Sequence, residues 1–516
     1  MNNDFYPWEM SSLLNATAMP VPMVIMTVSK PRYSAARVVT IRHMNVKTTL
    51  LDKLKAIVGS DHVLTGEQVS SRATHFWDTT PLQAFAIVRP ENTEQTAAVI
   101  RLCQSAKQSV VTHGGLTGLV DGNRSLPEDI VLSLERQREI EFIDPIGRTM
   151  TVQAGVQLQT VQKAAADAGL QFGLDLGARG SCTIGGNLST NAGGLSVLRY
   201  GMAREQVLGL EVVLADGTIL SSMNSLLKNN AGYDLKHMFI GSEGTLGIIT
   251  RAVLRLRPQM PKVHTALLAF ERFDQITATL GELDCRLNGT LDAFEVLWQS
   301  FYQLNTQPGC EDTVKAPLPT NYPYYAIVES RASDIPFATD QFQSALEFVF
   351  EKGLICDAAV AKSNTERHSI WHIREHIDRA LAHDPVFVYD ISLPIHSMNQ
   401  YITDLERNLE KHWPKCSLYV YGHLADSNLH ILIAPEPEDA VEDAQRQSWE
   451  SISNNLVYGP LGPLGGSVSA EHGIGLLKKD YLSLCRNDNE IQLMKLMKRT
   501  LDPACILNPG KIVSIE

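Results

Sequence analysis

Residues Ala86–Gly118 read AIVRPENTEQTAAVIRLCQSAKQSVVTHGGLTG. The apolar run Ala86–Arg89 predicts a buried strand, and an amphipathic helix follows that we expect Thr93 to cap. Val110–His113 predicts a second strand, and the glycine-rich loop Gly114–Gly118 comes directly after it. A strand, a helix, a strand and a glycine loop in this order are typical of an α/β unit.

Glycine is concentrated in the next part of the chain. Of the 35 glycines, 14 lie between Gly173 and Gly247, so turns and close backbone approaches dominate there. The apolar runs Val207–Leu214 and Ile248–Leu256, separated by glycine turns, predict antiparallel strands. After Pro258 glycine thins out and charged helical patterns appear, which places a domain boundary near that proline. The sequence shows no internal repeat.

Composition and charge restrict the function. The chain has 516 residues, of which 44% are hydrophobic and 20% charged, a composition that excludes wholesale disorder. A general nucleic-acid binder should be basic, whereas this chain has a net charge of −12, so we expect no nucleic-acid partner. The eight cysteines form no Cys-x-x-Cys pair, which indicates a reduced, cytoplasmic protein. The early apolar run Val21–Val28 is too short to cross a bilayer, so we expect no transmembrane segment.

The N-terminal segment 1–48 has its own composition. No Asp or Glu occurs from Met10 to Leu51, while five lysines and arginines do. This pattern is typical of an organelle leader, which would place the protein in the mitochondrial matrix. We favour the alternative, a poorly ordered extension with Met44 near the true beginning.

Three glycine-rich blocks are candidates for phosphate binding: Gly114–Gly118, Ile184–Gly194 and Ile240–Gly247. Successive backbone N–H groups in such loops form a concave anion site, and the missing side chains let a pyrophosphate approach. Each block alone can equally be a structural turn. None has the Gly-x-Gly-x-x-Gly fingerprint between a strand and a helix, and none ends in Gly-Lys-Ser/Thr. These absences argue against an ordinary NAD-binding domain and against an NTPase.

A candidate metal site lies in the C-terminal half. The predicted strands Leu418–Tyr421 and Leu429–Ile433 flank a polar turn, which a hairpin would use to bring His423 and His430 together. Glu471 follows a glycine-rich bend downstream. Two imidazoles and one carboxylate suit Zn²⁺ or Mn²⁺ and leave coordination positions open for a substrate.

The neighbours of these residues leave other interpretations open. His472 could serve as a general base, because imidazole titrates near neutral pH. Asp426 is either a competing ligand or a turn residue. The whole set fits no standard ligand pattern, so these histidines could also be ordinary surface or core residues.

Taken together, these motifs resemble the flavin-dependent 2-hydroxy acid dehydrogenases of the vanillyl-alcohol oxidase, or FAD-linked oxidase, superfamily. The chain looks most similar to the branch of the D-2-hydroxyglutarate and D-lactate dehydrogenases, from about Leu51 to Ile512. The matching stretches are Val88–Pro90, Gly114–Gly118, Asp175–Cys182, Ile184–Gly194, Leu208–Gly217, Gly232–Lys236, Gly241–Thr250, Arg374–Glu375, Asp390–Pro394, Gly422–His430, Ser469–Gly475 and Leu507–Lys511.

The resemblance implies an α+β fold, the two-subdomain FAD-binding fold of the vanillyl-alcohol oxidase (PCMH) type with a ferredoxin-like cap domain. The implied division of the chain is an N-terminal extension at 1–48, an FAD-binding domain at 49–260, a cap that holds substrate and metal at 261–460, and a C-terminal segment at 461–516 that completes the active site.

The resemblance also implies FAD as the cofactor. Because Leu116 stands where members with covalent FAD often carry a histidine, we expect FAD to be bound non-covalently. The implied FAD-binding residues are Gly114, Gly115, Leu116, Thr117, Gly118, Ile184, Gly185, Asn187, Thr190, Asn191, Gly193, Gly194, Gly244, Ile248, Ile249 and Asn508.

The chemistry implied by the resemblance is the oxidation of a D-2-hydroxy acid to the 2-oxo acid. His472 would take the hydroxyl proton while a hydride passes to flavin N5. Arg374 would clamp a carboxylate, and Asn428 and His472 would contact the substrate. The implied metal ligands are His423, His430 and Glu471, which would hold Zn²⁺ or Mn²⁺.

Substrate and partners follow from the same branch. D-2-hydroxyglutarate is the favoured substrate, with D-lactate or another monocarboxylic D-2-hydroxy acid as the alternative. Four residues depart from the branch: Val388 replaces a lysine, Asp378 a threonine, and Ala425 and Ser427 two turn glycines. We expect an electron-transfer flavoprotein or a quinone as the electron acceptor, and possible homodimers. A different class of enzyme, a His/His/Glu metallohydrolase, is the remaining alternative.

Overall fold

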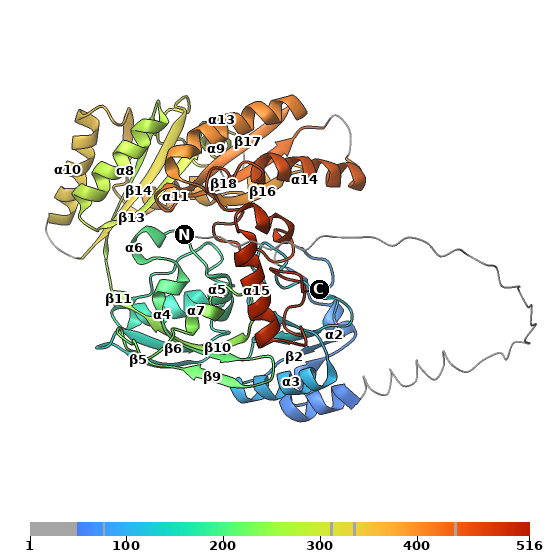
Figure 1. The fold of residues 1–516 in the computed structure, drawn as a ribbon. Coiled ribbons are helices and arrows are strands. Elements are labelled where there is room, and N and C mark those ends of the chain that lie inside the picture. Colours follow the sequence, from blue (N-terminus) through green and yellow to red (C-terminus); the bar gives the residue numbers. More distant parts are fainter. Residues whose placement is uncertain (1–48, 76–77, 310–312, 334–336, 438–440, 516) are drawn as a thin grey trace, which may run out of the picture. The chain divides into compact units, whose positions relative to one another are not determined.

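The computed structural model describes residues 49–75, 78–309, 313–333, 337–437 and 441–515. These residues form an α+β fold in which two sheets of the first half precede a large sheet of the second half (Figure 1). The predicted extension at 1–48 lies outside the described residues.

The first sheet confirms the strand–helix–strand prediction. Its order is β1 (Val63–Leu64), β2 (Ala86–Val88), β4 (Ile130–Ser133) and β3 (Val110–His113), with β2 and β3 both parallel to β4. Helix α3 (Thr93–Ala106) joins β2 to β3.

The predicted cap of α3 is wrong by one residue. Asn92 is the N-cap, because its side chain accepts a hydrogen bond from the backbone N–H of Gln95. The Thr93 hydroxyl instead donates to Glu211 across the core, at 2.7 Å.

The second sheet holds the predicted antiparallel strands. Its order is β5 (Ile140–Asp144), β6 (Thr149–Gln153), β10 (Ile248–Arg255), β8 (Val207–Val213) and β9 (Ile219–Ser222), and every neighbouring pair is antiparallel. A short pair, β7 (Leu170–Gln171) and β11 (Arg257–Pro258), lies beside it. Besides α3 and the helical residues 49–58, the helices of the first half include η1 (Ser60–His62), α2 (Glu67–Ser70), α4 (Leu158–Asp167), α5 (Ile184–Thr190), α6 (Val197–Tyr200), η2 (Ala203–Gln206) and α7 (Lys236–Phe239).

The cap sheet has seven antiparallel strands, in the order β15 (Asp357–Val360), β12 (Lys262–Phe270), β14 (Tyr324–Ala332), β13 (Leu291–Trp298), β17 (Cys416–His423), β18 (Asn428–Pro435) and β16 (Phe387–Ser392). Strands β12 to β15 follow the ferredoxin-like order, with α8 (Phe273–Leu287) and α10 (Phe337–Glu351) as crossovers.

The cap contains a repeat that the sequence does not show. Strand β16, helix α13 (Ile395–His412), strands β17 and β18 and helix α14 (Asp443–Tyr458) repeat the same β-α-β-β-α order, joined to the first half through β13 and β17. Helices α8, α10, α13 and α14 pack on one face of the sheet. The other face is covered by α9 (Gln299–Thr306), α11 (Asn364–Glu375) and α12 (Asp378–Leu381). The repeat is therefore one of topology, without a repeat in the sequence that would predict it.

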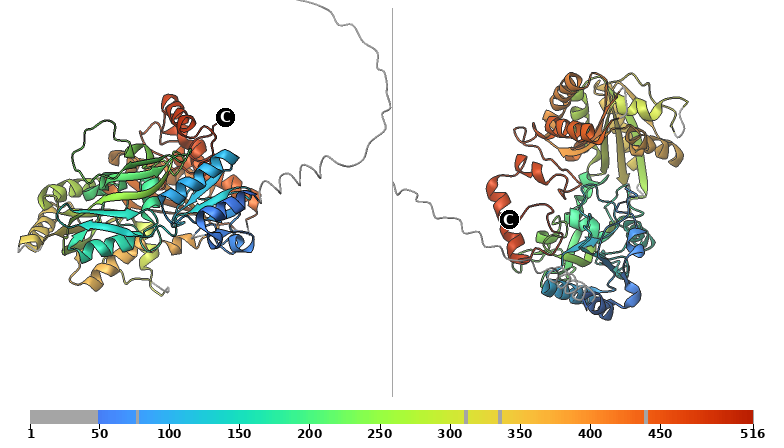
Figure 2. Two further views of the ribbon diagram at one scale, coloured as in Figure 1. Left: turned by 90° about the horizontal axis from the view of Figure 1, so that it is seen from below. Right: turned by 90° about the vertical axis from the view of Figure 1, so that its right-hand side faces the viewer.

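The C-terminal segment returns from the cap to the first half (Figure 2). It contains η4 (Lys479–Leu484) and α15 (Asp488–Leu501), whose N-cap is Asn487. Buried Lys498 donates to the backbone carbonyls of Thr245 and Leu507. Leu507 also bridges to Val110 of β3, so the chain end is fixed beside the glycine loop.

Candidate active site

The glycine loop after β3 lines a cavity of about 340 Å³. From Gly114 to Val120, no backbone N–H group has a hydrogen-bond acceptor among the described residues. Thr112 also lines the cavity, and its buried hydroxyl has no hydrogen-bond partner among the described residues either. A run of unpaired amides is suited to a pyrophosphate, so the cavity fits the phosphate group of FAD.

Most residues expected to bind FAD line this cavity. They are Gly114, Gly115, Leu116, Thr117, Gly118, Gly185, Asn187, Thr190, Gly193, Gly194, Gly244, Ile248, Ile249 and Asn508. Ile184 does not line it, because its side chain is buried in the core. Asn191 does not line it either, because its side chain accepts a hydrogen bond from the backbone N–H of Arg204.

The hairpin of β17 and β18 brings the candidate metal ligands together. Its 3-10 turn η3 (Leu424–Asp426) separates His423 from His430, and both imidazoles are buried. One ligand atom each of His423, His430 and Glu471 lies within 4.8 Å of the others. This donor set fits a divalent cation such as Zn²⁺ or Mn²⁺.

Buried Glu295, on β13, orients the first of these ligands. Its carboxylate contacts His423 Nδ1 at 2.6 Å, which leaves His423 Nε2 turned towards Glu471, 3.8 Å away. Burial alone would lower the pKa of His423, but the charge of Glu295 raises it to about 9. The negative charge of Glu295 therefore favours a positive charge at the His423 imidazole, either a proton on the ring or a metal ion bound to it. Sequence reasoning missed Glu295, since nothing beside it in the chain marks it.

Arg374 lines the larger cavity together with the candidate metal ligands His423, His430 and Glu471. Its Nε donates to Glu295 at 2.8 Å, and its Nη2 lies 3.1 Å from His423 Nε2. The guanidinium also stacks over the ring of Tyr421. A guanidinium has five N–H groups, so donors remain for a substrate carboxylate.

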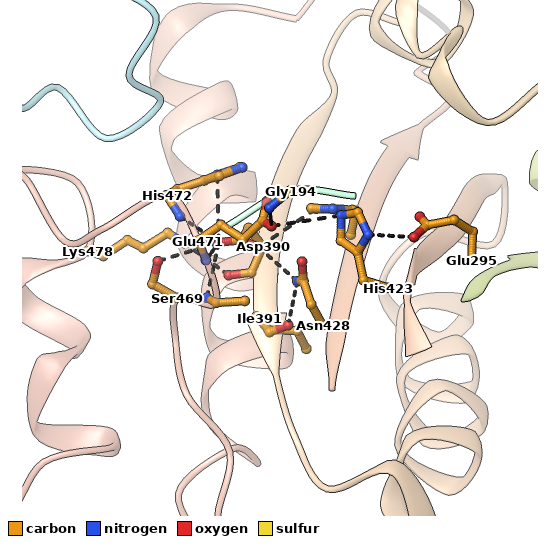
Figure 3. Close-up of polar contacts among 12 residues, drawn as sticks. Gly194, Glu295, Asp390, Ile391, His423, Asn428, Ser469, Glu471, His472 and Lys478 are labelled. Carbon is orange, nitrogen blue, oxygen red and sulfur yellow. Dashed lines mark hydrogen bonds and ion pairs between the residues drawn. The ribbon is translucent and has the colours of Figure 1, made fainter. Parts of the chain in front are cut away.

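Asp390, on β16, is a second residue that sequence reasoning missed. Its fully buried carboxylate accepts hydrogen bonds from three successive backbone N–H groups, those of Ala470, Glu471 and His472, at 2.9 to 3.1 Å (Figure 3). The sequence could have indicated Asp390, because it is the one carboxylate in a mostly apolar strand. Asp390, His430 and His472 form a second group with ligand atoms within 4.8 Å. Since Asp390 already accepts these bonds, His423, His430 and Glu471 are the better donor set.

Glu243, which belongs to the FAD-binding half, binds the backbone of the loop that carries Glu471 and His472. Its buried carboxylate accepts hydrogen bonds from the N–H groups of Ile474 and Gly475. Gly473 lies between the two anchored stretches at a φ of +88°, and a Cβ there would meet Glu243 at 2.7 Å. Two carboxylates from the two halves therefore set the conformation that presents Glu471 and His472.

Glu471 and His472 line both the glycine-loop cavity and a larger cavity of about 960 Å³ that also holds Arg374 and His423. Glu471 accepts a hydrogen bond of 2.8 Å from the N–H of Gly194. Burial lowers the pKa of His472, so its imidazole is neutral near pH 7 and can accept a proton. A flavin in the glycine-loop cavity and a substrate in the larger cavity would thus both lie next to His472.

Three residues singled out in the sequence lie away from this position. Asn428 does not line the larger cavity, because its buried amide donates to Asp390 and to the carbonyl of Ile391. The Oδ1 atom of Asn428 is buried without a hydrogen-bond partner among the described residues, and the expected substrate contact of Asn428 stays a prediction. Asp426 belongs to neither metal-ligand group among the described residues. Asp378 is exposed at the start of α12 and does not line the cavity.

Comparison with known proteins agrees with this geometry. Residues 84–222 match the FAD binding domain, and residues 259–512 match the C-terminal domain of FAD linked oxidases. Solved structures with the same fold include p-cresol methylhydroxylase, with a TM-score of 0.71 and 15% identity over 90% of this chain and 97% of that one. Alkyldihydroxyacetonephosphate synthase has a TM-score of 0.69 and 18% identity, covering 90% of this chain and 85% of its own.

Curated relatives are more similar in sequence to this chain than these solved structures are. The D-2-hydroxyglutarate dehydrogenase of Xanthomonas citri pv. viticola is 38% identical over 85% of this chain and 90% of its own length. The mitochondrial D-2-hydroxyglutarate dehydrogenase of Danio rerio is 37% identical over 90% of this chain and 81% of its own. The chain therefore belongs to the FAD-linked oxidase family, in the branch of these relatives, and is an FAD-dependent oxidoreductase of the class that acts on CH–OH groups. No helix in the described ranges is long and apolar enough to cross a membrane.

Proposed function

We propose that the protein is an FAD- and divalent-metal-dependent dehydrogenase that oxidises a D-2-hydroxy acid to the 2-oxo acid. The observation that carries the proposal is that Glu471 and His472 line both cavities. The names of the relatives support a D-2-hydroxy acid substrate, which for them is D-2-hydroxyglutarate. Non-covalent FAD, an electron-transfer flavoprotein or quinone as acceptor, and a homodimer belong to the same proposal.

Each residue has a role in this reaction. Bound FAD would supply the acceptor for the hydrogen and electron pair of the substrate C2–H bond. A Zn²⁺ or Mn²⁺ ion held by His423, His430 and Glu471 would act as a Lewis acid that lowers the pKa of the substrate hydroxyl. His472 accepts the hydroxyl proton, and Arg374 binds a carboxylate of the substrate. The C2–O bond becomes a carbonyl as the O–H and C2–H bonds break.

Anaerobic spectroscopy of the purified protein tests the proposal. We expect a yellow protein whose flavin is bleached by a D-2-hydroxy acid and not by its L-enantiomer. Treatment with a chelator should stop the bleaching without releasing FAD, and Zn²⁺ or Mn²⁺ should restore it. A colourless protein that hydrolyses substrates would instead support the His/His/Glu metallohydrolase. Bleaching at full rate in metal-free protein would remove the metal from the proposal.

A further inference from the structure

The wall of the larger cavity includes His430 of β18 and continues along β16, the strand next to it. Their register pairs Asp390 with His430 and, two residues further, Val388 with Leu432. Residues two apart on a strand share one face and lie about 7 Å apart. Val388 therefore shares the strand face of buried Asp390; it lines the larger cavity, and 48% of its surface is exposed.

The surroundings of Val388 are apolar. Three apolar residues line the same cavity: Ile377, just before α12, Leu381, the last residue of α12, and Val386, just before β16. An apolar wall favours an apolar group, because burial removes both surfaces from water.

Each cation on the cavity wall already has a carboxylate partner. Arg374 binds Glu295 at 2.8 Å and Arg179 binds Asp175 at 3.0 Å. Lys478 Nζ lies 3.8 Å from the Asp390 carboxylate. Glu375, 3.9 Å from Arg179, gives that cation a second carboxylate neighbour. With Glu450 it also lines the cavity, and these acids would repel a second substrate carboxylate. A carboxylate buried without a counter-charge is strongly disfavoured.

We propose that the substrate is a D-2-hydroxy acid with one carboxylate and an apolar aliphatic or aromatic side chain, which Val388, Ile377 and Leu381 contact. This inference rests on the proposed function and narrows its substrate. It separates this chain from its D-2-hydroxyglutarate-oxidising relatives, and it makes Val388 a specificity-determining residue.

Two substrates of similar side-chain length test the inference: D-2-hydroxyisocaproate, which ends in two methyl groups, and D-2-hydroxyglutarate, which ends in a carboxylate. We expect kcat/KM for anaerobic flavin reduction to be at least about tenfold higher for D-2-hydroxyisocaproate in the wild-type protein. D-Lactate, with only a methyl group, should fall below D-2-hydroxyisocaproate. A higher kcat/KM for D-2-hydroxyglutarate overturns the inference but leaves the proposed function intact. If no D-2-hydroxy acid reduces the flavin, the proposed function itself fails.

Variants locate the preference at Val388. Val388→Lys should shift the ratio of the two kcat/KM values towards D-2-hydroxyglutarate by about tenfold or more, because it places a cation on the apolar wall. Val388→Met keeps the wall apolar and should leave D-2-hydroxyisocaproate preferred. Leu493→Lys adds the same charge on the exposed face of α15 and should not change the ratio. An unchanged ratio in a flavin-loaded Val388→Lys protein would contradict the assignment of Val388.

Discussion

The carboxylate of Asp390 accepts a hydrogen bond of 2.9 Å from the backbone N–H of Glu471, 81 residues later in the chain. The same oxygen accepts the N–H groups of Ala470 and His472. A cap strand thereby fixes the backbone of the loop that carries a candidate metal ligand and the candidate base. Charge-assisted bonds of this kind are about twice as strong as neutral ones.

Asp390→Asn should weaken metal binding without releasing FAD. The amide keeps one acceptor oxygen but loses the charge that faces Lys478 and the three N–H groups, so Glu471 is less firmly placed. We expect metal affinity to fall about 10–100-fold, as for other residues that orient metal ligands. Competition with a chromophoric chelator measures this. Asp378→Asn, which changes an exposed carboxylate of the cap, is the matched control and should bind metal normally.

His472→Ala should retain FAD but lose reduction by substrate. Among the residues that the structure describes, no other imidazole lines both cavities, so the variant lacks the proposed acceptor of the hydroxyl proton. A decrease of about 10²–10⁴-fold in the anaerobic reduction rate is expected for a lost general base. Removing an exposed imidazole of α13, by His396→Ala, should leave the rate unchanged. Normal flavin reduction in His472→Ala would refute the assignment of the base.

Glu295→Gln should lower metal affinity by a different route. The variant removes the negative charge that contacts His423 Nδ1 and Arg374 Nε, so the field that favours a cation is weakened. We expect a loss of about 10–100-fold in affinity for Zn²⁺. Isothermal titration of the metal-free protein measures it, with Glu410→Gln on the exposed face of α13 as control. Equal affinities in the two variants would show that Glu295 does not act on the metal ligand.

Local sequence signals were sufficient for the elements and for part of the site. Strand β3 and its glycine loop follow from an apolar run and from glycine spacing, and α15 follows from its cap at Asn487. The hairpin that joins His423 to His430 was predictable because the two residues are close in the chain. Glu295 was not, since it reaches His423 only through the pairing of β13 with β17.

The orientation of the Asn428 side chain also could not be predicted from the sequence. The resemblance to the flavin-dependent dehydrogenases implies that Asn428 contacts the substrate. Its direction depends on the register of β16 with β18, which places Asn428 opposite Ser392 and lets its amide reach Asp390. The topological repeat of the cap is also invisible in the sequence, because the order of strands can be repeated without similar residues.

Ser427→Gly should stabilise the protein. Ser427 has a φ of +68°, in the left-handed region that disfavours residues with a Cβ. Relief of this strain is partly offset by the greater freedom of glycine in the unfolded chain, so we expect a net gain of about 0.5 kcal/mol. Thermal unfolding measures it, and Ser427→Ala is the matched control, because alanine retains the Cβ and should give no gain. Equal stability of the Gly and Ala variants would contradict the strain at this turn.

Glu135→Gln should remove a stabilising interaction that depends on pH. Glu135, after β4, binds Arg72 at 2.7 Å and Arg89 at 2.9 Å. Burial alone would raise the pKa of Glu135, but hydrogen bonds from the two arginines lower it to about 2. Because the folded-state pKa lies below the unfolded value of 4.5, the carboxylate stabilises the protein above about pH 4.5. This stabilisation is lost as the pH falls towards 2.

The cluster is partly open to solvent, with 23% of the Glu135 side chain exposed, so we expect a contribution of about 1–2 kcal/mol at neutral pH. Thermal midpoints of the wild-type and Glu135→Gln proteins should therefore differ at pH 7 and converge between pH 4.5 and pH 2. Glu94→Gln changes an exposed acid on α3 and should show no such convergence. A gap that stays constant down to low pH would mean that Glu135 keeps its ordinary pKa in the folded state, and that Arg72 and Arg89 pack beside it without stabilising its charge.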